Sequence, residues 1–141
     1  MPNTARPSAS HRGAGRLPPG ISGQIKGWLN LDGRFFLGPR YVTLLEGIDA
    51  TGTIRDGCRR TQMSYRTCLN RIRQMERALG RPLVVTARGG AAGGRAELTA
   101  EARRLVRLYR GWRDRMEQET RRAFAAARRD LAGSRHRARS R

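Results

Sequence analysis

The chain has 141 residues, which favours one domain, and carries 30 basic against 11 acidic side chains, a net charge of +19. This charge favours a polyanionic partner, either nucleic acid or an acidic membrane surface. No apolar stretch is long enough to span a bilayer, no signal peptide is recognisable, and two cysteines cannot build a disulfide framework. We therefore expect a protein without membrane association, located in the cytoplasm at the nucleoid.

Residues 1–22 are rich in Pro, Ser, Ala, Gly and Arg and show no apolar periodicity. They lack the apolar surface that would offset the chain entropy lost on folding, so we expect a disordered basic tail. Residues 24–37 are expected to form two strands, because Asp32-Gly33 is a frequent hairpin turn. Ile25, Trp28, Leu29 and Leu31 supply the apolar positions before that turn.

Three helices are expected to follow. Pro39 suits the first turn of a helix over 39–49, whose apolar face carries Tyr41, Leu44, Leu45 and Ile48. Thr53 can cap a short second helix, in which Gly57 costs about 1 kcal/mol against Ala. A close approach of another helix would be a reason to tolerate that glycine. After a turn at 61–63, Ser64 is a good N-cap for the third helix. One apolar stripe of this helix comprises Tyr65, Cys68, Leu69, Ile72, Met75 and Leu79.

A wing and a long helix complete the predicted elements. Leu83–Thr86 and Ala96–Leu98 are expected to be strands joined by a flexible glycine-rich tip over 89–94. Thr99 can cap a last helix that reaches about Arg128–Asp130, with a disordered Arg-rich tail over 131–141. The expected fold class is therefore mainly α with a small β wing: a winged helix-turn-helix over 23–98 and a long dimerisation helix over 99–130.

The third helix carries the predicted DNA contacts. Arg can bind both major-groove acceptors of guanine, and Asn can bind adenine bidentately. We expect Arg66, Thr67 and Asn70 at base edges, and Ser64 and Arg71 at phosphates or mixed positions. The wing arginines flank the glycine-rich tip and can follow the phosphates or enter the minor groove. The full predicted DNA-binding set is Ser64, Tyr65, Arg66, Thr67, Asn70, Arg71, Arg88 and Arg95.

The last helix has a seam of apolar residues at alternating spacings of three and four, which is typical of helix–helix packing. The seam could join two copies, act as an intramolecular strut, or do both. Because large aromatic side chains are costly to leave in water, we favour a homodimer. The predicted dimerisation residues are Leu105, Tyr109, Trp112 and Met116.

Catalysis, metals and cofactors find no support in the sequence. Both histidines, His11 and His136, fall in the expected tails, and no metal-binding or Ser-His-Asp spacing occurs. No small-molecule ligand is evident. Cys58 and Cys68 are interpreted as buried small apolar residues, with a redox-sensitive pair as the alternative, because two such helices can bring them close together.

Residues 24–124 resemble the DNA-binding domain of the ModE family of molybdate-responsive regulators, which is related to the LysR-type winged helix. The resemblance implies a dimeric, sequence-specific transcription factor whose third helix contacts DNA. Gln62 departs from it by replacing a glycine usual in the turn. We recognise no oxyanion-binding module of the molybdate sensors and no LysR-type effector domain in these residues, so we expect no direct molybdate sensing. The motifs that carry the resemblance are Pro39-Arg40, Leu44-Leu45, Thr51–Ile54, Met63–Arg66, Ile72 with Met75, Gly89-Gly90, Gly93-Gly94, Leu98-Thr99, and Leu105 to Tyr109.

Two other functions stay open. The arginine charge could serve a sequence-indifferent nucleoid-associated or RNA-binding protein. Alternatively, the wing and the long helix could form a protein–protein adaptor. These two functions and that of a sequence-specific regulator differ in the expected preference for particular DNA sites and in the dependence of affinity on salt.

Overall fold

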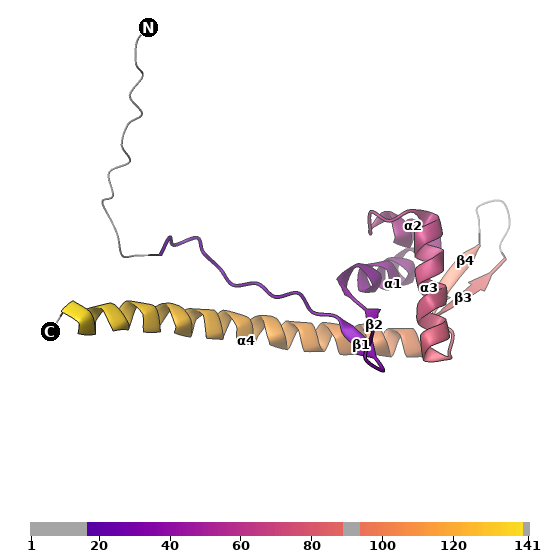
Figure 1. Ribbon diagram of the computed structural model, residues 1–141. Coiled ribbons are helices and arrows are strands. Elements are labelled where there is room, and N and C mark those ends of the chain that lie inside the picture. The colour runs from indigo at the N-terminus through magenta and orange to yellow at the C-terminus, as the bar shows by residue number, and fades with distance from the viewer. Residues whose placement is uncertain (1–16, 89–93, 140–141) are drawn as a thin grey trace, which may run out of the picture. The chain divides into compact units, whose positions relative to one another are not determined.

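The computed structural model describes residues 17–88 and 94–139. It divides into two compact units, one over Ile25–Glu119 and one that combines the N-terminal segment to Gln24 with Thr120–Arg141. Figure 1 shows the helices α1, α2 and α3 grouped together, with the β3–β4 hairpin beside them. The expected tail over 1–22 lies mostly outside the described residues.

The first hairpin is shorter than the expected strand pair. Strands β1 (Leu29–Leu31) and β2 (Arg34–Leu37) pair antiparallel, and Asp32 and Gly33 both adopt positive φ in the turn between them. Leu37 is buried in the core. Ile25 and Trp28 precede the strands and are exposed. Instead of pairing with a strand, the chain here contacts its own long helix, where the carbonyl of Gly27 accepts from the hydroxyl of Tyr109.

Helix α1 (Pro39–Thr51) begins with Pro39 in its first turn and ends at Gly52 in the left-handed region, two residues beyond the expected end. Helix α2 (Ile54–Arg59) packs against it at two glycines. A Cβ added to Gly57 would lie 2.6 Å from the backbone nitrogen of Ile48, and one added to Gly47 would lie 2.8 Å from the Cα of Gly57. The close helix approach predicted at Gly57 is therefore confirmed.

The turn between α2 and α3 (Tyr65–Leu79) is held by side-chain hydrogen bonds. The buried hydroxyl of Thr61 donates to the carbonyl of Cys58 at 2.7 Å and accepts from the amide of Met63 at 3.2 Å. Gln62 adopts a φ of 60°, the left-handed conformation that explains why glycine is the usual residue there. A non-glycine residue in this region carries some backbone strain, which the Thr61 hydrogen bonds offset.

The two cysteines are joined, contrary to the interpretation of free buried residues. Cys58 on α2 and Cys68 on α3 form a disulfide, with Cα atoms 6.1 Å apart. Both are buried as expected, at 3% and 0% exposure. Sequence spacing predicted that the two positions could approach each other, and the packing of α2 on α3 brings them into bonding contact.

The wing has the expected strands, β3 (Val84–Ala87) and β4 (Arg95–Leu98), which pair antiparallel with Val84 opposite Leu98. Glu76 attaches α3 to this hairpin, since its Oε1 accepts from the amides of Leu83 at 2.8 Å and Val84 at 3.1 Å. Most of the predicted glycine-rich tip, residues 89–93, lies outside the described part of the chain.

Helix α4 (Ala100–Arg139) is longer than predicted. The segment expected to be an unstructured tail continues the helix to Arg139. Thr99 caps it by accepting from the amide of Ala102 at 3.2 Å. Two arginines attach it to α1: Arg103 pairs with Asp49 at 3.0 Å, and Arg110 pairs with Glu46 through two nitrogens. Among the described residues, no helix has the length and apolarity needed to cross a membrane.

The core of the larger unit lies where the three helices, the wing and the first turns of α4 meet. Val42, which the predicted apolar face of α1 omitted, is fully buried there. Tyr109 is the largest fully buried side chain of this core, and the Tyr109 hydroxyl donates to the carbonyl of Gly27 at 2.9 Å. The structure is thus a mainly α winged helix-turn-helix followed by a long helix, as the sequence predicted.

Candidate nucleic-acid interface

Helix α3 has one buried face and one exposed face. Cys68, Ile72 and Met75 are buried against the core. Ser64, Arg66, Thr67 and Asn70 are exposed on the other side. The helix is thereby fixed from within, while its polar N-terminal edge stays accessible, which is the arrangement required of a helix that enters the major groove.

The members of this edge differ in how firmly they are held. The Ser64 hydroxyl caps α3 by accepting from the Thr67 amide at 3.1 Å, and the two hydroxyls lie 2.9 Å apart. Within the described part of the chain, the side chains of Arg66 and Asn70 make no hydrogen bond or ion pair. Their donors can therefore bind a ligand without first breaking an internal contact.

Arg71 lies farther along the helix and is half-buried. Its guanidinium is 5.4 Å from the centroid of the Tyr41 ring, and its Nη1 donates to Gln74 at 2.8 Å. These contacts fix the side chain toward α1. A phosphate contact suits this position better than a base contact, in keeping with the phosphate or mixed role predicted for Arg71.

A groove of about 730 Å³ opens between α2, the start of α3 and the wing. It contains three arginines and one acidic residue, so its charge favours an anion. Two of these arginines, Arg55 and Arg59, are not among the residues predicted from the sequence. The residues lining the groove are Thr53, Ile54, Arg55, Asp56, Arg59, Tyr65, Thr86, Ala87, Arg88, Gly94 and Ala96.

Tyr65 belongs to this groove and not to the buried stripe. Its side chain is 39% exposed, and the Arg55 guanidinium lies 4.5 Å from the centroid of its ring. The prediction that it lies on the inner face of α3 is therefore wrong. The position is the first residue of the helix, where the ring can turn away from the core and stack on a cation from α2.

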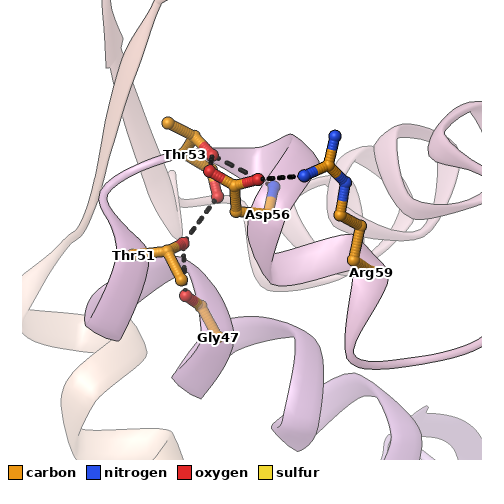
Figure 2. Close-up of polar contacts among 5 residues, drawn as sticks. All are labelled: Gly47, Thr51, Thr53, Asp56 and Arg59. Carbon is orange, nitrogen blue, oxygen red and sulfur yellow. Dashed lines mark hydrogen bonds and ion pairs between the residues drawn. The ribbon is translucent and has the colours of Figure 1, made fainter.

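The start of α2 is fixed by a set of hydrogen bonds beside the groove (Figure 2). Thr53 Oγ1 accepts from the amide of Asp56 at 3.0 Å and lies 3.0 Å from its Oδ2. Asp56 Oδ1 in turn accepts from Arg59 at 3.0 Å, and the Thr51 hydroxyl donates to the Gly47 carbonyl at 2.7 Å. The ion pair is exposed and worth about 1 kcal/mol or less, so its main effect is to orient Arg59.

The wing arginines are placed differently. Arg88 follows β3 and lines the groove, whereas Arg95 begins β4 and is exposed outside it. The groove thus combines Arg88 with Arg55 and Arg59 from α2. The sequence signal for Arg55 and Arg59 is their spacing of four residues, which places them on one side of a helix.

The predicted dimerisation residues lie largely in the chain's own core. Tyr109 is fully buried, and Leu105 and Trp112 are half-buried against the core cluster. The Trp112 ring packs on Gly27 and meets Tyr109 edge to face. Met116 is exposed, as is Leu108, which is 58% exposed and was not predicted. Of the two, Leu108 is the more exposed and can meet another molecule without disturbing the core.

Comparison with known proteins identifies relatives, although no family model matches the chain. The transcriptional regulator ModE of Yersinia pestis is 38% identical over 81 residues, 57% of this chain and 31% of that protein. The DNA-binding transcriptional dual regulator ModE of Escherichia coli K12 is 36% identical over 81 residues, with the same shares. ModE of Haemophilus influenzae is 31% identical over 96 residues, 68% of this chain and 36% of that protein.

The chain therefore spans about a third of the length of the curated relatives it matches, 31–36%. The similarity covers more than half of the chain itself, at 57–68%. This confirms the resemblance predicted from the turn, the wing and the start of the long helix: the chain is similar to the ModE transcriptional regulators.

Proposed function

We propose that the chain is a DNA-binding transcriptional regulator that recognises particular sites. The observation that carries the proposal is the exposed edge of α3, which includes Arg66 and Asn70, on a helix whose first residue, Tyr65, lines a cationic groove. Arg66, Thr67 and Asn70 are assigned to base edges, because their donors and acceptors suit guanine and adenine in the major groove. The names of the relatives, which are transcriptional regulators, support the same function.

The phosphate backbone is assigned to the surfaces on either side of this edge. Ser64 and Arg71 flank the base-contacting residues on α3, and Arg55, Arg59 and Arg88 face the groove between α2 and the wing. Arg95 is assigned a contact at the outer strand of the wing. Phosphate contacts fix the register of the protein on the duplex, so that α3 meets a defined set of bases.

A homodimer is the proposed assembly, with the exposed side of α4 around Leu108 and Met116 as the contact. Apolar side chains in solvent on a helix favour burial against a second copy. Leu108→Asp should therefore give monomers in sedimentation equilibrium. Trp112→Asp is unsuitable for this test, because that side chain packs in the chain's own core. A wild-type protein that is monomeric at micromolar concentration would contradict the dimer.

Titration of labelled duplexes over a range of salt concentrations tests the function itself. A regulator should bind one sequence at least about a thousandfold more tightly than bulk DNA at physiological salt. A sequence-indifferent binder would show a steep salt dependence with little preference between sequences. An adaptor would bind no duplex under those conditions. Either of the last two results would overturn the proposal.

A further inference from the structure

The disulfide between Cys58 and Cys68 crosses the helix-turn-helix at the point that sets the direction of α3. Cys58 lies near the end of α2, and Cys68 lies one turn into α3. The bond closes a loop with a sequence separation of 10, which contains the whole turn and the N-cap of α3. A change at this bond therefore acts on the two helices whose relative placement exposes the polar edge.

We infer that these cysteines form a reversible dithiol–disulfide couple that controls how firmly α3 is fixed, and through it the affinity for DNA. The effect on DNA affinity rests on the proposed function. A protein that acts on DNA in a reducing compartment seldom keeps a permanent structural disulfide, and disulfides that do form there are usually transient or redox-sensing.

The surroundings of the sulfur atoms accommodate both states. In the dithiol form, Cys58 Sγ has two acceptors already in place, the carbonyls of Met63 at 3.3 Å and Ser64 at 3.4 Å. Cys68 Sγ lies 3.7 Å from the hydroxyl of Thr61. The turn is also held by the bonds of the Thr61 hydroxyl to the backbone of Cys58 and Met63 and by the Ser64 cap, and these three bonds do not involve a sulfur atom. The chain can therefore keep its helix-turn-helix after reduction.

Reduction nevertheless changes the packing between α2 and α3. Two sulfur atoms that are no longer bonded must separate to van der Waals contact, and both cysteines are buried in a close-packed core. The six-residue α2 is the element that can move, because so short a helix has little stability of its own. Opening of α2 also gives a reagent access to the buried sulfurs.

The chemistry balances with a low-molecular-weight disulfide such as oxidised glutathione. The two cysteine thiols lose two electrons and two protons as their S–S bond forms. The S–S bond of glutathione disulfide breaks, and two glutathione thiols are released. The exchange passes through a mixed disulfide and runs in reverse with excess reduced glutathione or another thiol.

The disulfide form is expected to bind DNA more tightly, because the bond fixes α3 before binding and lowers the ordering cost of association. We expect the dissociation constant to rise about 3- to 10-fold on reduction. The double variant Cys58→Ser with Cys68→Ser is the matched control. It should resemble the reduced wild type and should not respond to oxidant.

The full chain is equilibrated with mixtures of reduced and oxidised glutathione, and its thiols are alkylated and counted by mass spectrometry. Duplex affinity and amide hydrogen exchange in α3 are measured on each form. The inference requires that the bond forms and breaks across these mixtures and that α3 exchanges faster when reduced. A bond that never responds to glutathione, or identical exchange in both forms, would overturn it.

The same data separate this inference from the proposed function. If neither form binds any duplex, the DNA-binding proposal fails, while the exchange rates in α3 still decide whether the couple controls that helix. If both forms bind with equal affinity, the DNA-binding proposal stands and redox control of affinity is refuted.

Discussion

The guanidinium of Arg55 lies over the ring of Tyr65, 4.5 Å from its centroid, and joins α2 to the first residue of α3 in the lining of the groove. The contact directs a cation into the groove at the position where the polar edge of α3 begins. The ring is partly exposed, so the pair is available to a ligand and also contributes about 0.5–1 kcal/mol to the packing of the two helices.

Arg55→Ala should weaken binding to all duplexes by a similar factor and reduce the slope of log affinity against log salt by about one, as expected for one lost phosphate contact. Tyr65→Phe keeps the ring and should leave affinity nearly unchanged, whereas Tyr65→Leu removes the stacked ring and should weaken binding. Arg107→Ala, which removes an equal charge on α4 away from the groove, is the control. An unaltered salt slope in Arg55→Ala would argue against a phosphate contact there.

Arg66→Ala should reduce the affinity for a preferred site by about 1–3 kcal/mol and relax specificity at one base pair, because a bidentate contact to guanine is lost. The measurement is a comparison of preferred and single-substituted duplexes by fluorescence anisotropy. Equal weakening for unrelated sequences would assign Arg66 to the phosphate backbone instead.

Gly57→Ala should destabilise the fold by about 1–3 kcal/mol, because the new Cβ would lie 2.6 Å from the backbone nitrogen of Ile48, which cannot move aside. Gly111→Ala is the matched control, since a Cβ there meets no atom within 4 Å. It should stabilise α4 by about 0.5–1 kcal/mol. Urea unfolding of both variants checks the pair, and stabilisation by both would contradict the close approach of α1 and α2.

The stability of the fold should fall as pH rises above about 10. Burial raises the pKa of Tyr109 above the ordinary tyrosine value of 10.0, so the unfolded chain loses this proton at a lower pH than the folded one. The contribution is fully present below pH 10 and is lost as pH rises toward the folded-state pKa. Tyr109→Phe should cost about 1 kcal/mol at neutral pH, through loss of the hydrogen bond to Gly27, and should make the alkaline decline shallower.

Most of the fold follows from local sequence signals. Thr53, Ser64 and Thr99 each begin a helix at the predicted residue, since a side-chain cap is a local device that sequence alone can specify. The need for a close approach at Gly57 was likewise predictable. Predictions failed where contacts between different elements decide the placement of a side chain. Tyr65 was placed inside by helical periodicity, but its ring stacks on Arg55 from another helix.

The long helix was likewise predictable only in part. Its apolar seam was recognised, but periodicity cannot tell whether the partner is a second copy or the chain's own core. The structure buries Tyr109 against Gly27 and the α1 core, and ion pairs to α1 fix the helix in that place. The hydrogen bond to Glu46 raises the pKa of Arg110 above its ordinary value, in keeping with a favourable pair. The groove arginines on α2 were missed because only the fold brings α2 and the wing together.

Selection of binding sites from a random duplex library, followed by affinity measurement at physiological salt, tests whether the edge of α3 recognises base sequence. We expect one enriched motif that is bound at least about a thousandfold more tightly than its shuffled version, with a position of relaxed preference in Arg66→Ala. A library that returns no motif, with equal affinity for every duplex, would contradict base recognition by α3.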